Sequence, residues 1–193
     1  VPGCIKNGID EKIANKIYDE MIDFAQYAFN KSHAAAYAYV TYQTAFLKYY
    51  YPVEYMAALM TSVIDKPTKV AEYIQVCRQM NIPILPPDIN KGEYGFSVSG
   101  GSILYALSAI KSVGRPVIEA IVAERKEHGE YLSVKNFIER NMEAVNKRAI
   151  ENFIKAGALD CLEGNRHQKM VVFGQIVDDI SRNKKQSMAG QLS

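Results

Sequence analysis

The sequence predicts a mainly α-helical protein with one small β-hairpin near residues 94–106. Apolar residues recur at helical spacing over most of the 193 residues, and residues that favour helix N-caps precede these runs. Two short apolar runs flank the paired glycines Gly100-Gly101, which is typical of a hairpin. The length allows two small domains at roughly 100 residues each. We place their boundary near residue 82, where the helical pattern stops.

Composition indicates a packed protein with few charged binding sites. Hydrophobic residues make up 48% and charged residues 23%, which excludes the disordered, collagen-like and disulfide-scaffold classes. No run approaches the ~18 uncharged apolar residues of a membrane span, so we expect no membrane partner. The 23 basic and 21 acidic residues give a net charge of +2, so any contact with nucleic acid is confined to a few sites.

Cysteine usage predicts a cytoplasmic protein. The three cysteines lie far apart, no Cys-x-x-Cys occurs, and the three histidines are equally scattered. Unpaired cysteines suit a reducing compartment, and the scatter predicts no metal site within the chain. The chain starts at Val1 without Met, and no signal-peptide pattern follows, so we expect an excised piece of a larger protein.

Residues 1–82 read as a series of helices. The first is capped by Asp10 and ends near residues 27–29, and its apolar positions are Ile13, Ile17, Met21 and Phe24. Ser32 is predicted to cap a second helix, which Pro52 ends. A third helix is expected over 53–63, and Thr68 is predicted to cap a fourth.

The chain changes character after residue 82. Three prolines within 82–88 exclude a helix and predict an extended, packed connector. The hairpin follows, and from residue 107 the helices return. We expect helices over 107–111 and 115–126, and then three capped by Ser133, Asn146 and Asn165. The last helix is expected to give way to a polar tail after Ser181, within a third segment of residues 165–193.

Residues 107–121, LSAIKSVGRPVIEAI, form the most readable motif. A short helix, a tight turn and a second helix make a helix-hairpin-helix, a pattern of non-specific DNA-binding proteins. Gly114 would let the backbone turn and approach a ligand closely, and the following helix start favours a phosphate. Val113 would anchor the turn from inside, and Lys111 and Arg115 would add charge contacts. The usual motif has glycine where this chain has Ser112, whose hydroxyl can also donate a hydrogen bond to a phosphate. A plain helical corner is the alternative interpretation.

A second turn at Ala156-Gly157-Ala158 resembles a degenerate copy of the first. It lies between the apolar run of residues 150–154 and the pair Leu159 and Leu162. Residues 83–164 would then form a tandem helix-hairpin-helix DNA-binding domain, joined by a connector helix over 134–140. Lys155 and Gly157 would contact the DNA backbone, and Lys147 and Arg148 would lie near this second hairpin.

Longer runs resemble one family. AFNKSHAAAY at 28–37, TYQTAFLK at 41–48 and YPVEYMAALMT at 51–61 are similar to the fingers region of the C-family replicative DNA polymerases of bacteria. ILPPDIN at 84–90, LSAIK at 107–111 and IKAGALD at 154–160 match the same family in the same order. The resemblance covers roughly residues 3–163. It implies that residues 1–82 are part of a helical fingers subdomain.

The fingers resemblance implies a nucleotide site at the start of the second helix. Lys31 and His33 stand at a helix N-terminus, which suits a polyphosphate. Tyr37 lies four residues after His33 and would stack on the incoming base. Tyr42, Gln43 and Lys48 are weaker candidates. A tyrosine-rich helix that is simply core is the alternative.

The resemblance also implies what lies outside the chain. In this family two divalent ions, Mg²⁺ in the parent enzyme, are held by palm carboxylates that precede this region. The acidic residues here show no matching pattern, so we expect no catalytic or metal residues within the chain and no polymerisation by the chain alone. The implied partners are primer-template DNA, deoxynucleoside triphosphates and, through other regions, the sliding clamp.

Two other functions remain open on the sequence. The chain could be a non-catalytic helix-hairpin-helix module of a repair or replication protein, with residues 83–163 as the working part. It could also be a helical interaction protein whose tyrosine-rich helix is a contact surface. Nucleotide binding discriminates the polymerase from the first, and salt-dependent duplex binding excludes the second.

Overall fold

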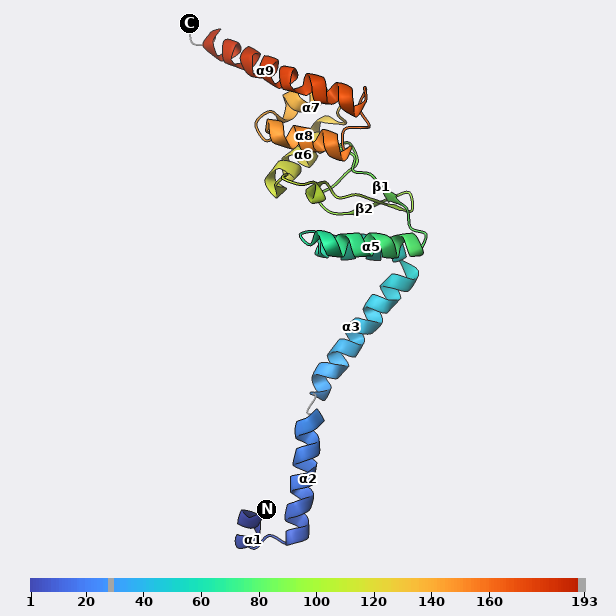
Figure 1. The fold of residues 1–193 in the computed structure, drawn as a ribbon, viewed down its shortest axis with the longest axis vertical. Helices are drawn as coiled ribbons and strands as arrows, with labels where there is room; N and C mark the ends of the chain where they lie inside the picture. The colour runs from blue at the N-terminus through green and yellow to red at the C-terminus, as the bar shows by residue number, and fades with distance from the viewer. Residues whose placement is uncertain (28–29, 191–193) are drawn as a thin grey trace. The chain divides into compact units, whose positions relative to one another are not determined.

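A computed structural model describes residues 1–27 and 30–190 of the chain (Figure 1). The described residues are mainly helical with one small three-stranded sheet, which confirms the predicted fold class. The chain divides into two compact units, Val1–Leu47 and Lys48–Ser193. Ala28 and Phe29, which begin the AFNKSHAAAY run and on which the predicted end of the first helix falls, lie outside the described residues.

The first unit contains α1 (Pro2–Lys6), α2 (Glu11–Tyr27) and most of α3 (Lys31–Tyr50). The Asp10 carboxylate accepts hydrogen bonds from the backbone N–H groups of Lys12 and Ile13 at 2.9 and 3.3 Å, which confirms it as the N-cap of α2. The prediction of Ser32 as the cap of α3 was wrong. Asn30 takes that role, because its side-chain oxygen accepts from the Ser32 N–H at 2.9 Å.

The apolar positions of α2 have the predicted helical spacing but are exposed. The exposed fractions of Ile13, Ile17, Met21 and Phe24 are 55%, 49%, 62% and 72%. In α3, likewise, no described residue is buried. Ala14 is the buried exception on α2, at 4% exposure. The helical pattern in this unit therefore reflects local sequence preference rather than a core that the unit forms by itself.

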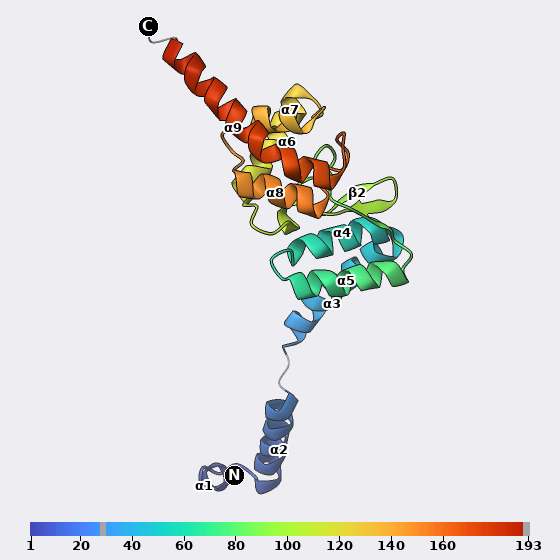
Figure 2. The same ribbon diagram turned by 45° about the horizontal axis from the view of Figure 1, so that its top comes forward.

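The second unit begins with the end of α3, followed by α4 (Pro52–Ser62) and α5 (Pro67–Gln79), which lie side by side (Figure 2). Pro52 separates α3 from α4 as predicted. Thr68 does not cap α5, because the helix already begins at Pro67 and its N-cap residue Lys66 makes no side-chain cap bond. A proline in the first helical turn supplies the helical φ, and it has no N–H that needs a cap.

The sheet contains the predicted hairpin and one further strand. Strands β2 (Ser97–Ser99) and β3 (Ser102–Leu104) pair antiparallel, and Gly100 and Gly101 adopt φ of 55° and 78° in the turn. Strand β1 (Ile84–Leu85) belongs to the proline-rich connector and pairs parallel with β3. The sheet order β1-β3-β2 was not predicted.

The predicted boundary near residue 82 falls inside a core. Met60 and Cys77 from the helices before it pack in one cluster with residues after it, namely Phe96 just before β2 and Ile103 in β3. The Phe96 N–H also donates to the Thr61 hydroxyl at 3.0 Å. Strands β2 and β3 both contact α4 across residue 82, and the division into two compact units falls at 47–48.

A second core is formed by the short 3₁₀ helix η1 (Leu107–Ala109) and four α-helices. These are α6 (Arg115–His128), α7 (Val134–Asn141), α8 (Lys147–Ala156) and α9 (Arg166–Gly190). In Figures 1 and 2, α9 runs across α7 and α8. Tyr131, Phe137 and Phe153 meet edge to face at its centre, with ring centroids 5.1 and 6.0 Å apart.

The three predicted caps of these helices are confirmed. Ser133, Asn146 and Asn165 accept hydrogen bonds from backbone N–H groups two or three residues inside α7, α8 and α9, at 3.1, 2.9 and 2.9 Å. The end of α9 differs from the prediction, because the helix continues past Ser181 to Gly190. Residues 182–189 contain no proline or glycine to stop it, and Lys184 pairs with Glu143 at 2.6 Å.

The connector meets the helices at Ile89. The Ile89 N–H donates to the Ala158 carbonyl at 2.8 Å, and its own carbonyl accepts from the Arg125 guanidinium at 2.8 Å. Arg125 is only 8% exposed and also donates to the Gly92 carbonyl at 2.8 Å. A charged side chain at this depth is retained only when its N–H groups are paired, as they are here.

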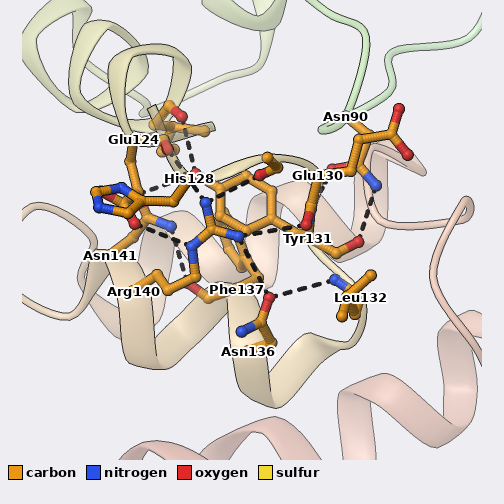
Figure 3. Close-up of polar contacts among 12 residues, drawn as sticks. Asn90, Glu124, His128, Glu130, Tyr131, Leu132, Asn136, Phe137, Arg140 and Asn141 are labelled. Atoms are coloured by element: carbon orange, nitrogen blue, oxygen red, sulfur yellow. Dashed lines mark hydrogen bonds and ion pairs between the residues drawn. The ribbon is translucent and has the colours of Figure 1, made fainter. Parts of the chain in front are cut away.

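Arg140 closes the junction between α6 and α7 (Figure 3). Its guanidinium donates to the Glu124 carboxylate at 2.9 Å and to the Gly129 carbonyl at 2.9 Å, and it lies 4.5 Å above the Tyr131 ring. His128 approaches the same carboxylate at 3.1 Å. The hydrogen bond from Arg140 holds the pKa of Glu124 below its usual value of 4.5.

Replacing Glu124 by Gln is expected to reduce the acid sensitivity of the fold. The folded-state pKa of Glu124 is depressed, so its stabilisation is present above the unfolded value of 4.5 and is lost as the pH falls through the folded value. Urea unfolding at several pH values from neutral to about pH 3 measures this. The loss of unfolding free energy on acidification should be smaller in E124Q than in the parent, whereas E127Q, an exposed change on the same helix, should behave as the parent. Equal losses in E124Q and the parent would contradict the assignment.

Candidate nucleic-acid interface

The first hairpin joins η1 to α6 through residues 111–114. Ser112 adopts φ of 63°, in the left-handed region, whereas Gly114 has φ of −77° and ψ of 157°. The prediction that Gly114 makes the turn was therefore wrong, because its conformation is open to any residue. The strained position is Ser112, where the usual motif has glycine, and glycine adopts positive φ without a Cβ clash.

The burial of Val113 agrees with the prediction, because this side chain is 8% exposed and anchors the turn from inside. Gly114 is the N-cap of α6 and has no side chain to bond the first-turn N–H groups. Within that turn, however, Pro116 carries no N–H, and the Val117 N–H donates to the Gly114 carbonyl at 3.1 Å. This helix start therefore offers few N–H groups to a phosphate, and the role predicted for it stays a prediction.

The two cations of this hairpin differ in their surroundings. Arg115 donates to Glu119 at 2.7 Å, which raises the arginine pKa, and its guanidinium lies 4.8 Å above the Tyr94 ring. Both partners of this ion pair are more than half exposed, so the pair is weak and can exchange for a phosphate. Lys111 is exposed, and its carbonyl accepts from the Asn152 amide at 2.9 Å.

The second hairpin keeps its turn but not the expected copy of the motif. Gly157 ends α8 with φ of 84°, and a Cβ there would come within 2.1 Å of the Arg166 guanidinium. Leu159 and Leu162 are buried at 0% and 5% exposure, but they lie in turns rather than a helix. The partner helix is α9, which begins at Arg166, so this hairpin is longer than the first.

Lys147 and Arg148 do not lie near the second hairpin, contrary to the prediction. They begin α8, whose ten residues span about 15 Å, whereas Gly157 follows its other end. Lys147 pairs instead with Asp178 on α9 at 2.6 Å. Lys155, one residue before the end of α8, does lie beside the hairpin and pairs with Glu151 on its own helix.

Two cations of the C-terminal segment support the second hairpin. Arg166 binds the Asp160 carboxylate through Nε and Nη2 at 3.0 and 2.6 Å, and this holds the pKa of Asp160 below its usual value. Lys169 is 2% exposed and donates to the Leu159 and Leu162 carbonyls, both at 2.8 Å. Nothing in the sequence pattern marks Lys169 as a buried lysine.

The structure brings the two hairpins together at one pocket. Lys111 and Lys155 both line a cavity of about 510 Å³, together with Asn152. Sequence reasoning missed Asn152, since a polar residue on an outer helix face has the appearance of a solvated position. Its hydrogen bond to Lys111 crosses 41 residues of chain, a contact that only the tertiary fold creates.

The predicted nucleotide residues lie in the first unit. Lys31 is the first residue of α3, and the His33 and Tyr37 rings lie 4.3 Å apart with a 44° tilt, so these two share a helix face as predicted. Tyr37 is 61% exposed. Tyr42 and Gln43 line a separate surface cavity of about 480 Å³ with Phe46 and Leu47. Their roles toward a nucleotide stay predictions.

The described residues contain no candidate metal site and no candidate membrane span. Across residues 1–27 and 30–190, no three His, Cys, Asp or Glu side chains gather as a metal ion would need. None of the helices in this part of the chain has the length and apolar character to cross a membrane.

Comparison with known proteins agrees with this geometry. A family model described as a helix-hairpin-helix motif matches residues 81–169, which contain both hairpins. Residues 81–169 within the second unit are therefore a helix-hairpin-helix region. The DNA polymerase III subunit alpha of Chlamydia trachomatis is 43% identical over 188 residues, which are 97% of this chain and 15% of that protein.

Other relatives carry the same name. The protein of Thermus aquaticus is 48% identical over 161 residues, 83% of this chain and 13% of its own length. That of Vibrio cholerae is 44% identical over 191 residues, 98% of this chain and 16% of its own length. The chain belongs to the family of bacterial DNA polymerase III alpha subunits, and it spans about 15% of the relatives' length.

Substituting Gly157 by Ala is expected to lower the free energy of unfolding by about 1–3 kcal/mol. The cause is the left-handed φ of 84°, which strains any residue with a Cβ, whereas the Arg166 guanidinium next to the new Cβ ends a flexible side chain and can move away. Gly174→Ala is the matched control, because Gly174 lies within α9 and its Cβ would meet nothing within 4 Å. G174A should gain roughly 0.5–1 kcal/mol of helix stability. Chemical denaturation measures both, and a G157A variant as stable as the parent would refute the assignment.

Proposed function

We propose that this chain is a DNA-gripping and nucleotide-contacting segment of a template-directed DNA polymerase that replicates bacterial chromosomes. The kinship with DNA polymerase III alpha subunits supports the polymerase. The juxtaposition of two hairpins, each with a lysine lining one pocket, supports a grip on the duplex backbone. Contacts of this kind position DNA without reading its sequence, as a replicative enzyme needs.

The charge distribution favours a small area of contact between this chain and DNA. The net charge is only +2, and Arg166, Lys169 and Lys184 are engaged within the protein. Lys111 and Arg115 at the first hairpin and Lys155 at the second remain at the surface, in the open or in exchangeable pairs. The duplex would therefore be held through few phosphates near the two hairpins, with Gly157 keeping the second turn in shape.

The fingers assignment concerns the start of α3. Lys31 would contact the triphosphate, His33 would add a donor, and Tyr37 would stack on the nascent base pair. The pairing of the His33 and Tyr37 rings at 4.3 Å supports a common face for this contact. Asn30 already bonds one N–H of the first turn, so side chains rather than backbone groups would supply most of the binding.

The catalytic step itself belongs outside this chain. The described residues provide no cluster of carboxylates that fits a metal pair, so Mg²⁺ would be held by palm carboxylates elsewhere in the polymerase. Those ions would stabilise the attacking and leaving oxygens of nucleotidyl transfer. The sliding clamp would bind through other regions as well, and the enzyme would act in the cytoplasm.

Neutralising Lys111 and Arg115 together is expected to weaken duplex binding and to flatten its salt dependence. Each lost phosphate contact lowers the slope of log affinity against log salt by about 0.9. The slope for K111A/R115A should therefore be smaller than that of the parent by up to about 1.8. Fluorescence anisotropy with a labelled duplex at several salt concentrations measures this. K66A/K69A removes two exposed charges at the start of α5 and should bind as the parent does. If both double variants bind alike, the first hairpin is only a structural corner.

Lys31→Ala in the full-length polymerase is expected to weaken apparent nucleotide affinity by about tenfold or more, the cost of one charge-assisted hydrogen bond. Steady-state primer extension with varied nucleotide concentration measures it. Lys16→Ala, an exposed change on α2, is the matched control. The 193-residue chain alone should give no extension with Mg²⁺. An unchanged affinity in K31A would remove the triphosphate role, and extension by the chain alone would remove the assignment of catalysis to other regions.

A further inference from the structure

The cavity between the first hairpin and α8 has a mixed character. Tyr105, Ile110 and Ala156 contribute aromatic and aliphatic lining, and Lys111 and Lys155, the two charged residues of the lining, complete it. The Tyr105 ring is held in place by an edge-to-face contact with Phe96 at 5.1 Å. A ligand that fits such a lining combines an apolar body with a negative charge. In duplex DNA the deoxyribose and its phosphate provide that combination.

Asn152 places the two lysines at the same cavity. Its amide donates to the Lys111 carbonyl at 2.9 Å, so the peptide immediately before the strained Ser112 is fixed to α8. Lys155 follows Asn152 by three residues on that helix and therefore lies on the same face. The hydrogen bond thus brings a cation from each hairpin to one cavity, although the two residues are far apart in the chain.

Glu151 competes for one of these cations. Its carboxylate pairs with Lys155 one helical turn away, and the two side chains are 36% and 59% exposed. An exposed pair of this spacing on a helix is weak, so a phosphate at the cavity can displace the carboxylate. Glu151 would therefore reduce DNA affinity without touching DNA.

We infer that Lys111 and Lys155 hold one and the same backbone phosphate of duplex DNA at this cavity, and that Asn152 is the residue that positions them. This inference rests on the proposed grip of the hairpins on DNA and goes further, because it couples the two hairpins through a single phosphate. The sugar next to that phosphate would lie against Tyr105 and Ile110. Asn152 acts through Lys111 and is a positioning residue.

The salt dependence of duplex binding tests the shared phosphate. In the full chain, K111A and K155A should each weaken binding. The K111A/K155A double variant should lower the slope of log affinity against log salt by about 0.9 in total, because a single phosphate contact is lost. A fall of about 1.8 would mean two separate phosphates and would overturn the inference. Unchanged duplex binding in K155A would also overturn the inference. If K111A and R115A also bind as the parent does, the proposed function itself fails, which is a distinguishable result.

Two further variants test the roles of Asn152 and Glu151. N152A removes no charge but should weaken duplex binding about three- to tenfold. When N152A is already present, adding K155A should weaken duplex binding less than K155A does in the parent chain. A purely structural Asn152 would lower stability while leaving the K155A effect unchanged. E151Q should tighten binding about twofold by freeing Lys155, whereas E127Q, which makes the same change in net charge, should not. Equal effects of E151Q and E127Q would show a general charge effect and contradict the competition.

Discussion

The peptide at Ile89 is the contact on which the arrangement of both hairpins depends. Its N–H donates to the Ala158 carbonyl in the second turn, and its carbonyl accepts from the buried Arg125 guanidinium of α6, the helix that follows the first turn. Asn90 extends the contact, exchanging two hydrogen bonds with the Tyr131 backbone at 2.9 and 2.8 Å. A connector that looks passive in the sequence therefore fixes the distance between two binding elements. Because buried polar groups are costly when unpaired, such a network holds a single geometry.

That geometry explains how a nearly neutral chain can bind a polyanion. Buried or internally paired cations, such as Arg125, Arg166 and Lys169, maintain the shape of the hairpins. The cations left for phosphate are few, but two of them converge on one cavity. Convergence of charge at a partly apolar cavity raises its local effect well above what the net charge suggests. The exposed apolar face of α2 is separate from this cavity, and it is exposed because the first unit buries little surface of its own.

The local elements were predictable because short-range chemistry decides them. Asp10, Ser133, Asn146 and Asn165 cap helices through bonds to N–H groups within three residues. Pro52 ends a helix by steric conflict with the residue before it, and Gly100-Gly101 supplies the positive φ of the hairpin. The wrong predictions concern positions where two nearby residues could each take the same local role. Asn30 outcompeted Ser32, and Ser112 rather than Gly114 took the left-handed position, because Val113 must reach the core.

The sequence by itself therefore determined the helical class, most caps, the hairpin and the resemblance to a polymerase family, since each depends on neighbours in the chain or on whole runs of residues. The tertiary structure alone decided which lysines are buried, that β1 joins β3, that the core passes across residue 82, and that Asn152 joins Lys111. These contacts link residues distant in sequence. Their free energy depends on burial and on the pairing of polar groups, and periodicity along the chain carries no record of either.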